Sequence, residues 1–299
     1  MRLRKYHGAG NDFVMLADLE ARMGPPGSLA PDLVSALCDR HTGIGADGVI
    51  RILAEPGDAE RRMDYYNADG SPAEMCGNGI RCLVLHEQRA GRLDDSDHIV
   101  MTVAGPVIVR GQGAGRFTVD MGTPVLRRED IPMTGSGSSL RVEVALDGDS
   151  LRGSAVSMGN PHLVLFTDEI GRALDDDLVL GLGPRLEVHP DFPARTNVEF
   201  VEVVNATTLR LRVWERGIGE TLACGSGICA AMAAAASLQR TGPHIRVEVP
   251  GGSLEVEWEP GGHIWLTGPA EEVFEGEIDS HWLEARGLER HAGLVGEAI

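Results

Sequence analysis

The sequence predicts an α+β protein of two pseudo-symmetric domains, each a mostly antiparallel sheet wrapped around a helix. Three observations predict this: a cysteine motif that occurs twice, a second pair of matching segments at nearly the same offset, and a similar succession of strand and helix patterns in both halves. The cysteine motif reads MCGNGIRC around Cys76 and ACGSGICA around Cys224, and the two cysteines lie 148 positions apart (224 − 76 = 148). Similar segments half a chain length apart indicate an internal repeat.

The second pair of matching segments is GNDFV, which contains Asn11, and GNPHL, which contains Asn160. Their offset is 149 (160 − 11 = 149). We therefore expect an N-terminal domain of residues 1–121, joined by a returning C-terminal segment 270–283, and a C-terminal domain of residues 122–269. We expect the active site in the cleft between them. Residues 285–299 are weakly patterned and are expected to form a loosely structured tail.

The succession of elements is similar in the two halves. Each half opens with strand-like text, KYHGAGNDFVMLAD in one and GSAVSMGNPHLVLF in the other. In the first half a helix is expected from Pro31, with Leu33, Leu37 and Cys38 on one face. Alternating apolar residues predict strands at 49–53, 99–103, 107–109, 209–213 and 254–258. An apolar helix is expected after each cysteine motif, at 80–89 and 228–239.

Charge and composition exclude several classes of protein. The 299 residues carry a formal net charge of −18, which disfavours binding to nucleic acid or to acidic membranes. The N-terminus has no signal-peptide pattern, and the most apolar stretch, 228–238, is too short to span a bilayer. Five cysteines without an export signal favour a cytoplasmic protein with reduced thiols.

Cys76 and Cys224 each precede Gly-x-Gly and an apolar helix, so each sulfur is expected at a helix N-terminus. Free N–H groups and the positive end of the helix dipole favour the thiolate, which predicts a lowered cysteine pKa. Two such sites on related domains suit racemisation at an amino-acid α-carbon, where one face needs a base and the other an acid. The two helix ends would stabilise the substrate carboxylate as charge builds on the carbanion. No cofactor is expected.

Other interpretations of the motifs are weaker. Cys38, Cys82 and Cys229 lie inside helical patterns and are expected to be buried apolar residues. The spacings of the cysteines in the two motifs would not direct their side chains toward one zinc ion, so no metal is expected. Gly43–Gly48 matches the dinucleotide-binding pattern, but a helix precedes it and a strand follows it, which is the reverse of the required order.

Six segments, in order and in both halves, carry a specific family resemblance. They are KYHGAGNDFVMLAD, RHTGIGADGV, MDYYNADGSPAEMCGNGIRC, SMGNPHLVLF, RTNVEFVEV and WERGIGETLACGSGICAA. In these segments, up to about Ser280, the chain resembles the diaminopimelate epimerase family. Proline racemases share the paired cysteines but resemble the chain less, since their first motif usually carries His where Asn78 stands.

The resemblance implies a diaminopimelate epimerase-like fold and a cofactor-independent enzyme, an isomerase that interconverts LL- and meso-2,6-diaminopimelate in lysine and peptidoglycan biosynthesis. It also implies a homodimer. The family's catalytic cysteines fall on Cys76 and Cys224, and the positions that tune them fall on His162 and Glu215. Its substrate-binding positions fall on Asn11, Asn67, Gly77, Asn78, Asn160, Asn197, Glu215, Arg216, Gly225 and Ser226. The chain departs from some members at Gly48, where they carry Gln, which puts one distal polar contact in doubt.

The chemistry of these residues suits a substrate with an amino-acid group at each end. Arg216 can grip a carboxylate with two hydrogen bonds, and the asparagines offer donors and acceptors. Two alternatives stay open: a racemase or epimerase of another amino acid in the same two-cysteine family, and a non-catalytic amino-acid-binding protein. Facing thiols also predict inactivation by a disulfide under oxidant and recovery under reductant.

Overall fold

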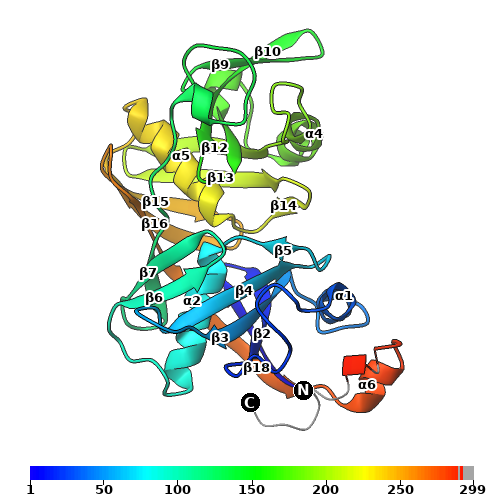
Figure 1. Cartoon of the computed structure of the whole chain (residues 1–299). Coiled ribbons are helices and arrows are strands. Elements are labelled where there is room, and N and C mark those ends of the chain that lie inside the picture. Colours follow the sequence, from blue (N-terminus) through cyan, green and yellow to red (C-terminus); the bar gives the residue numbers. More distant parts are fainter. Residues whose placement is uncertain (289, 292–299) are drawn as a thin grey trace. The chain divides into compact units, whose positions relative to one another are not determined.

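The structure is a computed structural model that describes residues 1–288 and 290–291 (Figure 1). The chain forms two compact units. Unit 1 consists of Met1–Val119 together with the chain from Pro269 onward, and unit 2 consists of Asp120–Gly268. The second unit thus begins two residues before the expected start at 122. Each unit has mixed strands and few helices, and the expected α+β class is confirmed.

In its described residues, unit 1 contains three α-helices, the strands of the N-terminal half and one strand from the end of the chain. Its elements are β1 (Arg2–Gly8), β2 (Asn11–Ala17), α1 (Pro31–Cys38), β3 (Gly48–Ala54), β4 (Arg61–Asn67), β5 (Pro72–Ala73), α2 (Gly77–Arg89), β6 (His98–Thr102), β7 (Gly105–Gly111), β8 (Arg116–Asp120), β18 (Glu271–Glu277) and α6 (Ser280–Glu284). Their hydrogen-bonded order is β18-β1-β2-β3-β4-β6-β7-β8, and β5 pairs with the C-terminal end of β4.

Unit 2 contains the elements of the second half. They are η1 (Arg128–Asp130), β9 (Val142–Leu146), β10 (Asp149–Ser157), β11 (Pro161–Phe166), α3 (Thr167–Ile170), α4 (Asp176–Glu187), β12 (Asn197–Asn205), β13 (Thr208–Glu215), β14 (Gly219–Thr221), α5 (Gly225–Ser237), β15 (His244–Val249), β16 (Gly252–Trp258) and β17 (Ile264–Pro269). Their order is β9-β10-β11-β12-β13-β15-β16-β17, and β14 pairs with the end of β13.

The two units have the same strand topology. In unit 1 the pairs β2–β3 and β4–β6 are parallel and the other pairs are antiparallel. In unit 2 the parallel pairs are β11–β12 and β13–β15, at the same places in the order. In each unit a helix lies between the two strands of the first parallel pair, α1 between β2 and β3, and α4, after the short α3, between β11 and β12. A second helix precedes the later strand of the other parallel pair, α2 before β6 and α5 before β15. The repeat seen in the sequence is therefore a repeat of fold.

The helix that follows each cysteine begins earlier than expected. We expected helices at 80–89 and 228–239, whereas α2 begins at Gly77 and α5 begins at Gly225. The first turns hold glycines, which lower helix propensity, but two of these glycines, Gly79 and Gly227, pack so closely that a Cβ would not fit. A Cβ on Gly79 would lie 2.5 Å from Ile50 Cδ1. Helix α5 also stops at Ser237, because Gln239 adopts a left-handed conformation with φ 58°.

The expected strands all occur. The segments 49–53, 107–109, 209–213 and 254–258 lie inside β3, β7, β13 and β16, and 99–103 extends one residue past the end of β6. Helix α1 covers the expected residues and ends at Cys38. None of the described helices is long and apolar enough to cross a membrane.

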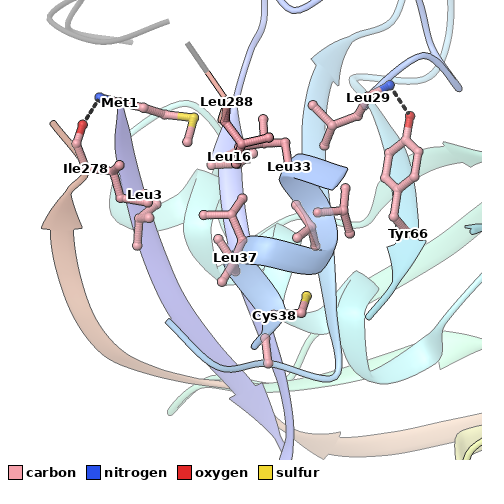
Figure 2. Packing of buried hydrophobic residues seen from close by; sticks show 14 of the residues in the cluster. Met1, Leu3, Leu16, Leu29, Leu33, Leu37, Cys38, Tyr66, Ile278 and Leu288 are labelled. Carbon is pink, nitrogen blue, oxygen red and sulfur yellow. Dashed lines mark hydrogen bonds between the residues drawn. The ribbon is translucent and has the colours of Figure 1, made fainter. Parts of the chain in front are cut away.

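The core on the α1 side of unit 1 includes the N-terminus and the returning C-terminal segment. Figure 2 shows Leu33 and Leu37 of α1 packed against Leu16, with Leu288 reaching the same cluster. The amino group of Met1 donates to the carbonyl of Ile278, 2.6 Å away. The C-terminal segment therefore packs on unit 1 rather than on the half that precedes it in the sequence.

Residues just after α6 have defined contacts. The side chain of Leu288 is buried, and the Arg286 guanidinium donates to the carbonyl oxygen of Thr42. Arg290 pairs with Asp32 at the start of α1. Of the segment 285–299, for which we expected a loosely structured tail, residues 289 and 292–299 lie outside the described part of the chain.

Candidate functional site

Cys76 is the N-cap residue of α2 in unit 1. Its backbone is extended (φ −143°, ψ 114°), and Gly77 and Asn78 are the first two residues of the helix. The side chain is partly exposed, in contrast to Asn78, which is buried. The sulfur therefore lies at the start of a 13-residue helix, where N–H groups lack helical partners.

Asn11 lies at the start of β2 and faces Cys76. The Cys76 thiol donates to Asn11 Oδ1 over 3.6 Å, and Asn78 Nδ2 donates to the same oxygen over 3.1 Å. The Asn11 amide nitrogen in turn donates to the carboxylate of Asp47, 2.7 Å away. Asp47 thus fixes the orientation of the Asn11 side chain, with its oxygen toward the cysteine. Asp47 was not among the expected site residues, although it lies in the glycine-rich segment GIGADG.

Asn67 has a different set of partners from the other candidates of unit 1. It ends β4 and begins a turn in which its backbone N–H donates to the Ser71 carbonyl, and its side-chain nitrogen donates to Ser71 Oγ over 3.0 Å. Asn78 instead receives a hydrogen bond from Arg81, 2.6 Å away. The structure therefore joins Cys76, Asn11 and Asn78 in one cluster, and holds Asn67 in its own turn.

Steric contacts explain why position 48 is a glycine in this chain. A Cβ at this position would lie 2.4 Å from the Tyr66 carbonyl oxygen and 2.7 Å from a ring carbon of Tyr65. The Tyr65 ring occupies the space, where it also packs edge-on against Phe13 with ring centroids 5.9 Å apart. Gly48 has no side chain, so it does not make the polar contact that a glutamine at this position would make.

Cys224 occupies the equivalent position in unit 2, as the N-cap residue of α5 (φ −115°, ψ 113°). Gly225 and Ser226 are the first two residues of the helix, and Cys224 Sγ lies 3.4 Å from Ser226 Oγ. At the end of β13, Glu215 accepts a hydrogen bond from the Thr221 hydroxyl. Cys224 is buried, whereas its counterpart Cys76 is partly exposed.

His162 on β11 is fully buried between two polar partners. Its Nδ1 lies 2.7 Å from Glu199 Oε1, and its Nε2 lies 2.9 Å from Asn160 Oδ1. Glu199, on the neighbouring strand β12, is also fully buried. Glu199 was not among the expected site residues. The imidazole is therefore held at both nitrogens, with Asn160 at one end and a carboxylate at the other.

The expectation of a lowered pKa is wrong for Cys224. Burial raises the pKa of the Cys224 thiol well above its usual value, and the negative charge of Glu215 raises it further. Hydrogen bonds from Ser226 and from the Gly227 N–H act in the opposite direction but are weaker. Burial also raises the pKa of Glu215, against hydrogen bonds from Thr221 and Cys224. The helix end favours the thiolate, as expected, but desolvation outweighs it.

Asn197 and Arg216 form a second cluster in unit 2. The Asn197 side-chain oxygen accepts from the Arg216 N–H over 2.9 Å, while its nitrogen donates to the Pro161 carbonyl over 3.0 Å. The Arg216 side chain is exposed, and its guanidinium donates to the Ala194 carbonyl over 3.1 Å. Asn197 therefore fixes the backbone that carries Arg216, and leaves a largely exposed guanidinium.

The other three cysteines are buried, as expected from their helical patterns. Burial raises the pKa of Cys38 to about 12 and raises the pKa of Cys82 still further. In the described part of the chain, no group of three or more His, Cys, Asp or Glu side chains is placed to hold a metal ion.

A family model and curated relatives match most of the chain. The model described as diaminopimelate epimerase matches residues 3–127 and 154–273. The diaminopimelate epimerase of Moorella thermoacetica is 45% identical over 284 residues, which cover 93% of this chain and 99% of the relative. That of Synechococcus elongatus is 43% identical over 282 residues, which cover 93% of this chain and 98% of the relative.

Solved structures with much lower identity share the fold. A probable proline racemase from Agrobacterium radiobacter, with bound carbonate, has a TM-score of 0.69 at 14% identity and covers 98% of this chain and 99% of that chain. A hydroxyproline epimerase from Agrobacterium vitis, with bound trans-4-hydroxy-L-proline, has a TM-score of 0.68 at 14% identity and covers 92% and 91%.

Proposed function

Since the chain belongs to the diaminopimelate epimerase family, we propose that it interconverts LL- and meso-2,6-diaminopimelate without a cofactor. One observation carries this proposal. The two units repeat one topology, and each has a cysteine as the N-cap of the equivalent helix, Cys76 before α2 and Cys224 before α5. A reaction that adds a proton to either face of one carbon needs such a matched acid and base.

In the proposed reaction one cysteine is a thiolate and the other is a thiol. The thiolate removes the α-proton from one face of the substrate, and the electron pair remains on the α-carbon as a carbanion. The thiol then delivers its proton to the opposite face, so the stereocentre is inverted and the two cysteines have exchanged protonation states. The N-termini of α2 and α5 would stabilise the adjacent carboxylate as negative charge develops.

The surroundings of Cys224 support the thiol as its resting state. Burial and the carboxylate of Glu215 keep the pKa of Cys224 high, which favours its thiol form. We therefore assign the acid role to Cys224 in the resting enzyme, with Glu215 as its hydrogen-bond acceptor. His162, held between Asn160 and Glu199, is proposed to tune the cysteines together with Glu215, as the resemblance implies.

Substrate binding is proposed to use the polar groups around both helix ends. Asn11, Gly77 and Asn78 on one unit, and Asn160, Gly225 and Ser226 on the other, would hold the reacting amino-acid group. Arg216 would bind the distal carboxylate, because its guanidinium is exposed and its backbone is fixed by Asn197. Asn67 and Asn197 would supply the remaining polar contacts at the distal end.

We further propose that the enzyme is a cytoplasmic homodimer that serves lysine biosynthesis. A feature of β18 supports the dimer. This strand pairs with β1, and it exposes Val273 and Phe274 to solvent. Large apolar side chains on an outer strand favour association with another chain. Light scattering of wild type and of Phe274→Asp tests it: a dimer that the variant weakens supports the proposal, and a wild-type monomer contradicts it.

A substrate panel tests the proposed function. Proton NMR would follow LL-diaminopimelate, meso-diaminopimelate, proline, 4-hydroxyproline and glutamate, each with purified reduced protein. We expect LL- and meso-diaminopimelate to interconvert and the mono-amino acids to stay unchanged. Turnover of a mono-amino acid without turnover of diaminopimelate would instead identify another racemase of the two-cysteine class. Tight binding with no turnover of any compound would favour a binding protein.

A further inference from the structure

Glu199 carries a buried carboxylate and is not among the proposed substrate-binding residues. Its side chain is fully buried on β12, in the layer between the sheet of unit 2 and α5. One oxygen, Oε1, lies 2.7 Å from His162 Nδ1. The other oxygen, Oε2, has no hydrogen-bond partner among the described residues. A buried acid with an unsatisfied oxygen is costly, so it is expected to persist where function requires it.

The repeated topology shows what stands at this position in unit 1. Phe13 pairs with Gly48, the first residue of β3, and His162 pairs with Asn197, the first residue of β12. The third residue of β3 is Ile50, and the third residue of β12 is Glu199. One unit therefore has Phe13 and Ile50 where the other has His162 and Glu199.

Ile50 and Glu199 each pack beneath the first turn of the helix that follows the cysteine of their unit. A Cβ on Gly79 of α2 would meet Ile50, and a Cβ on Gly227 of α5 would lie 2.7 Å from Glu199 Oε1. The apolar contact beneath Cys76 is thus replaced beneath Cys224 by a histidine–carboxylate pair. Packing alone does not require this replacement, because the isoleucine of unit 1 supports the same helix start.

We propose that Glu199 is a positioning residue for the epimerase reaction: its carboxylate fixes the His162 ring through Nδ1 and holds a negative charge beneath the helix end at Cys224. This inference rests on the proposed function. With Nδ1–H directed to Glu199, the ring orientation is set and Nε2 is directed to Asn160, which is one of the proposed substrate-binding residues. A carboxylate that orients a catalytic histidine by this hydrogen bond is a recurring arrangement in enzymes.

The charged and titratable neighbours of Glu199 come from three elements. They are His162 on β11, Glu215 on β13 and Cys224 before α5. The negative charge of Glu199 contributes to raising the pKa of both Glu215 and Cys224, while His162 acts in the opposite direction on Glu215. Removal of the Glu199 charge should therefore make the Cys224 thiolate easier to form.

The test is Glu199→Gln, which keeps the shape of the side chain and removes its charge. In substrate-free protein, iodoacetamide alkylation of each cysteine would be followed against pH by peptide mass spectrometry. We expect the midpoint for Cys224 to fall by about 0.5–1 pH unit, and that for Cys76 to stay unchanged. In the epimerase assay we expect kcat to fall about 10- to 100-fold while KM changes less than about threefold.

Two further variants distinguish an effect on the reaction from a general loss of structure. Glu87→Gln removes another fully buried carboxylate of unit 1, whose hydrogen bonds come from Arg61 and Arg92 and which lies 3.8 Å from His86 Nε2. It should lower stability without moving either alkylation midpoint. Glu199→Asp keeps the charge but shortens the reach to His162. It should keep the Cys224 midpoint near that of wild type while kcat falls.

The outcomes are distinct. A folded Glu199→Gln protein with wild-type alkylation midpoints and wild-type kcat overturns the proposal. If Glu199→Gln does not fold, Glu199→Asp decides, because unchanged kcat in that variant also overturns it. The alkylation experiment contains no substrate. A shifted Cys224 midpoint in a protein that does not turn over diaminopimelate would therefore refute the proposed function and leave the electrostatic role of Glu199 intact.

Discussion

Gly227→Ala tests the packing beneath the second cysteine by adding a single methyl group. In wild type the position of that methyl group lies 2.7 Å from Glu199 Oε1 and 3.3 Å from Glu199 Cδ. An ordinary contact begins near 3.4 Å, so the carboxylate must move by about 0.7 Å. It is held by His162 at 2.7 Å and is fully buried, which leaves it little freedom to move.

The magnitude follows from three effects. Alanine is a better helix former than glycine by about 1 kcal/mol. Overpacking a tight interior costs about 1–3 kcal/mol, and disturbing a hydrogen bond to a charged group costs about 1.5–3 kcal/mol. We therefore expect Gly227→Ala to lower the free energy of unfolding by about 2–4 kcal/mol. The epimerase rate should also fall, because the displaced carboxylate no longer fixes the His162 ring.

Gly181→Ala is the matched control, since Gly181 lies in the exposed part of α4 and a Cβ there would have no neighbour within 4 Å. This variant should gain up to about 1 kcal/mol of stability. Equilibrium urea unfolding, followed by circular dichroism, measures both variants under the same conditions. If Gly227→Ala proved as stable as Gly181→Ala and kept wild-type kcat, the close contact beneath α5 would be wrong.

Three other predictions concern stability and binding. Burial lowers the pKa of His86 to about 4, so the unfolded state binds a proton more readily than the folded state. The contribution of the neutral, buried His86 to stability is therefore full above about pH 6.5 and is lost as the pH falls toward 4. Urea unfolding at pH 4.5 and 7.5 should show this loss in wild type and a smaller loss in His86→Phe; equal losses would contradict the assignment. Asp64→Asn should cost about 3 kcal/mol, because Arg51 is fully buried and its Nε lies 3.1 Å from Asp64, and a cost below about 1 kcal/mol in urea would refute this reasoning. Arg216→Met should raise KM for diaminopimelate at least tenfold and leave stability within about 0.5 kcal/mol of wild type, since the side chain is exposed; an unchanged KM would exclude it from the distal contact.

The overall fold could be predicted because its repeat is carried by local patterns. The offset between Cys76 and Cys224 identified two similar halves, and each Gly-x-Gly before an apolar run indicated a sulfur at a helix start. The first turns of α2 and α5 were missed, because glycine lowers helix propensity. The reason for glycine at position 79 lies in Ile50, which is distant in sequence and adjacent only after folding.

The electrostatics of the site could not be predicted in the same way. Glu199 lies in a segment, TNVEFVEV, in which Asn197 and Glu199 alternate with Val198 and Phe200, as they do in a strand with one face in solvent. In the structure α4 and α5 each pack against β12, so Glu199 is buried, and neither helix contact is visible in the sequence of the strand. The pKa of Cys224 was expected to be low from the helix end alone. Burial and the nearby Glu215 reverse the sign, and both depend on tertiary contacts.

The most direct test of the two-cysteine mechanism is proton exchange in D2O. LL-diaminopimelate would be incubated with reduced wild-type protein and with Cys76→Ala and Cys224→Ala, and the α-proton signal would be followed by NMR. We predict loss of the signal with wild type, with meso product formed, and no epimerisation with either variant. Epimerisation at the wild-type rate by either variant would contradict the paired thiol and thiolate.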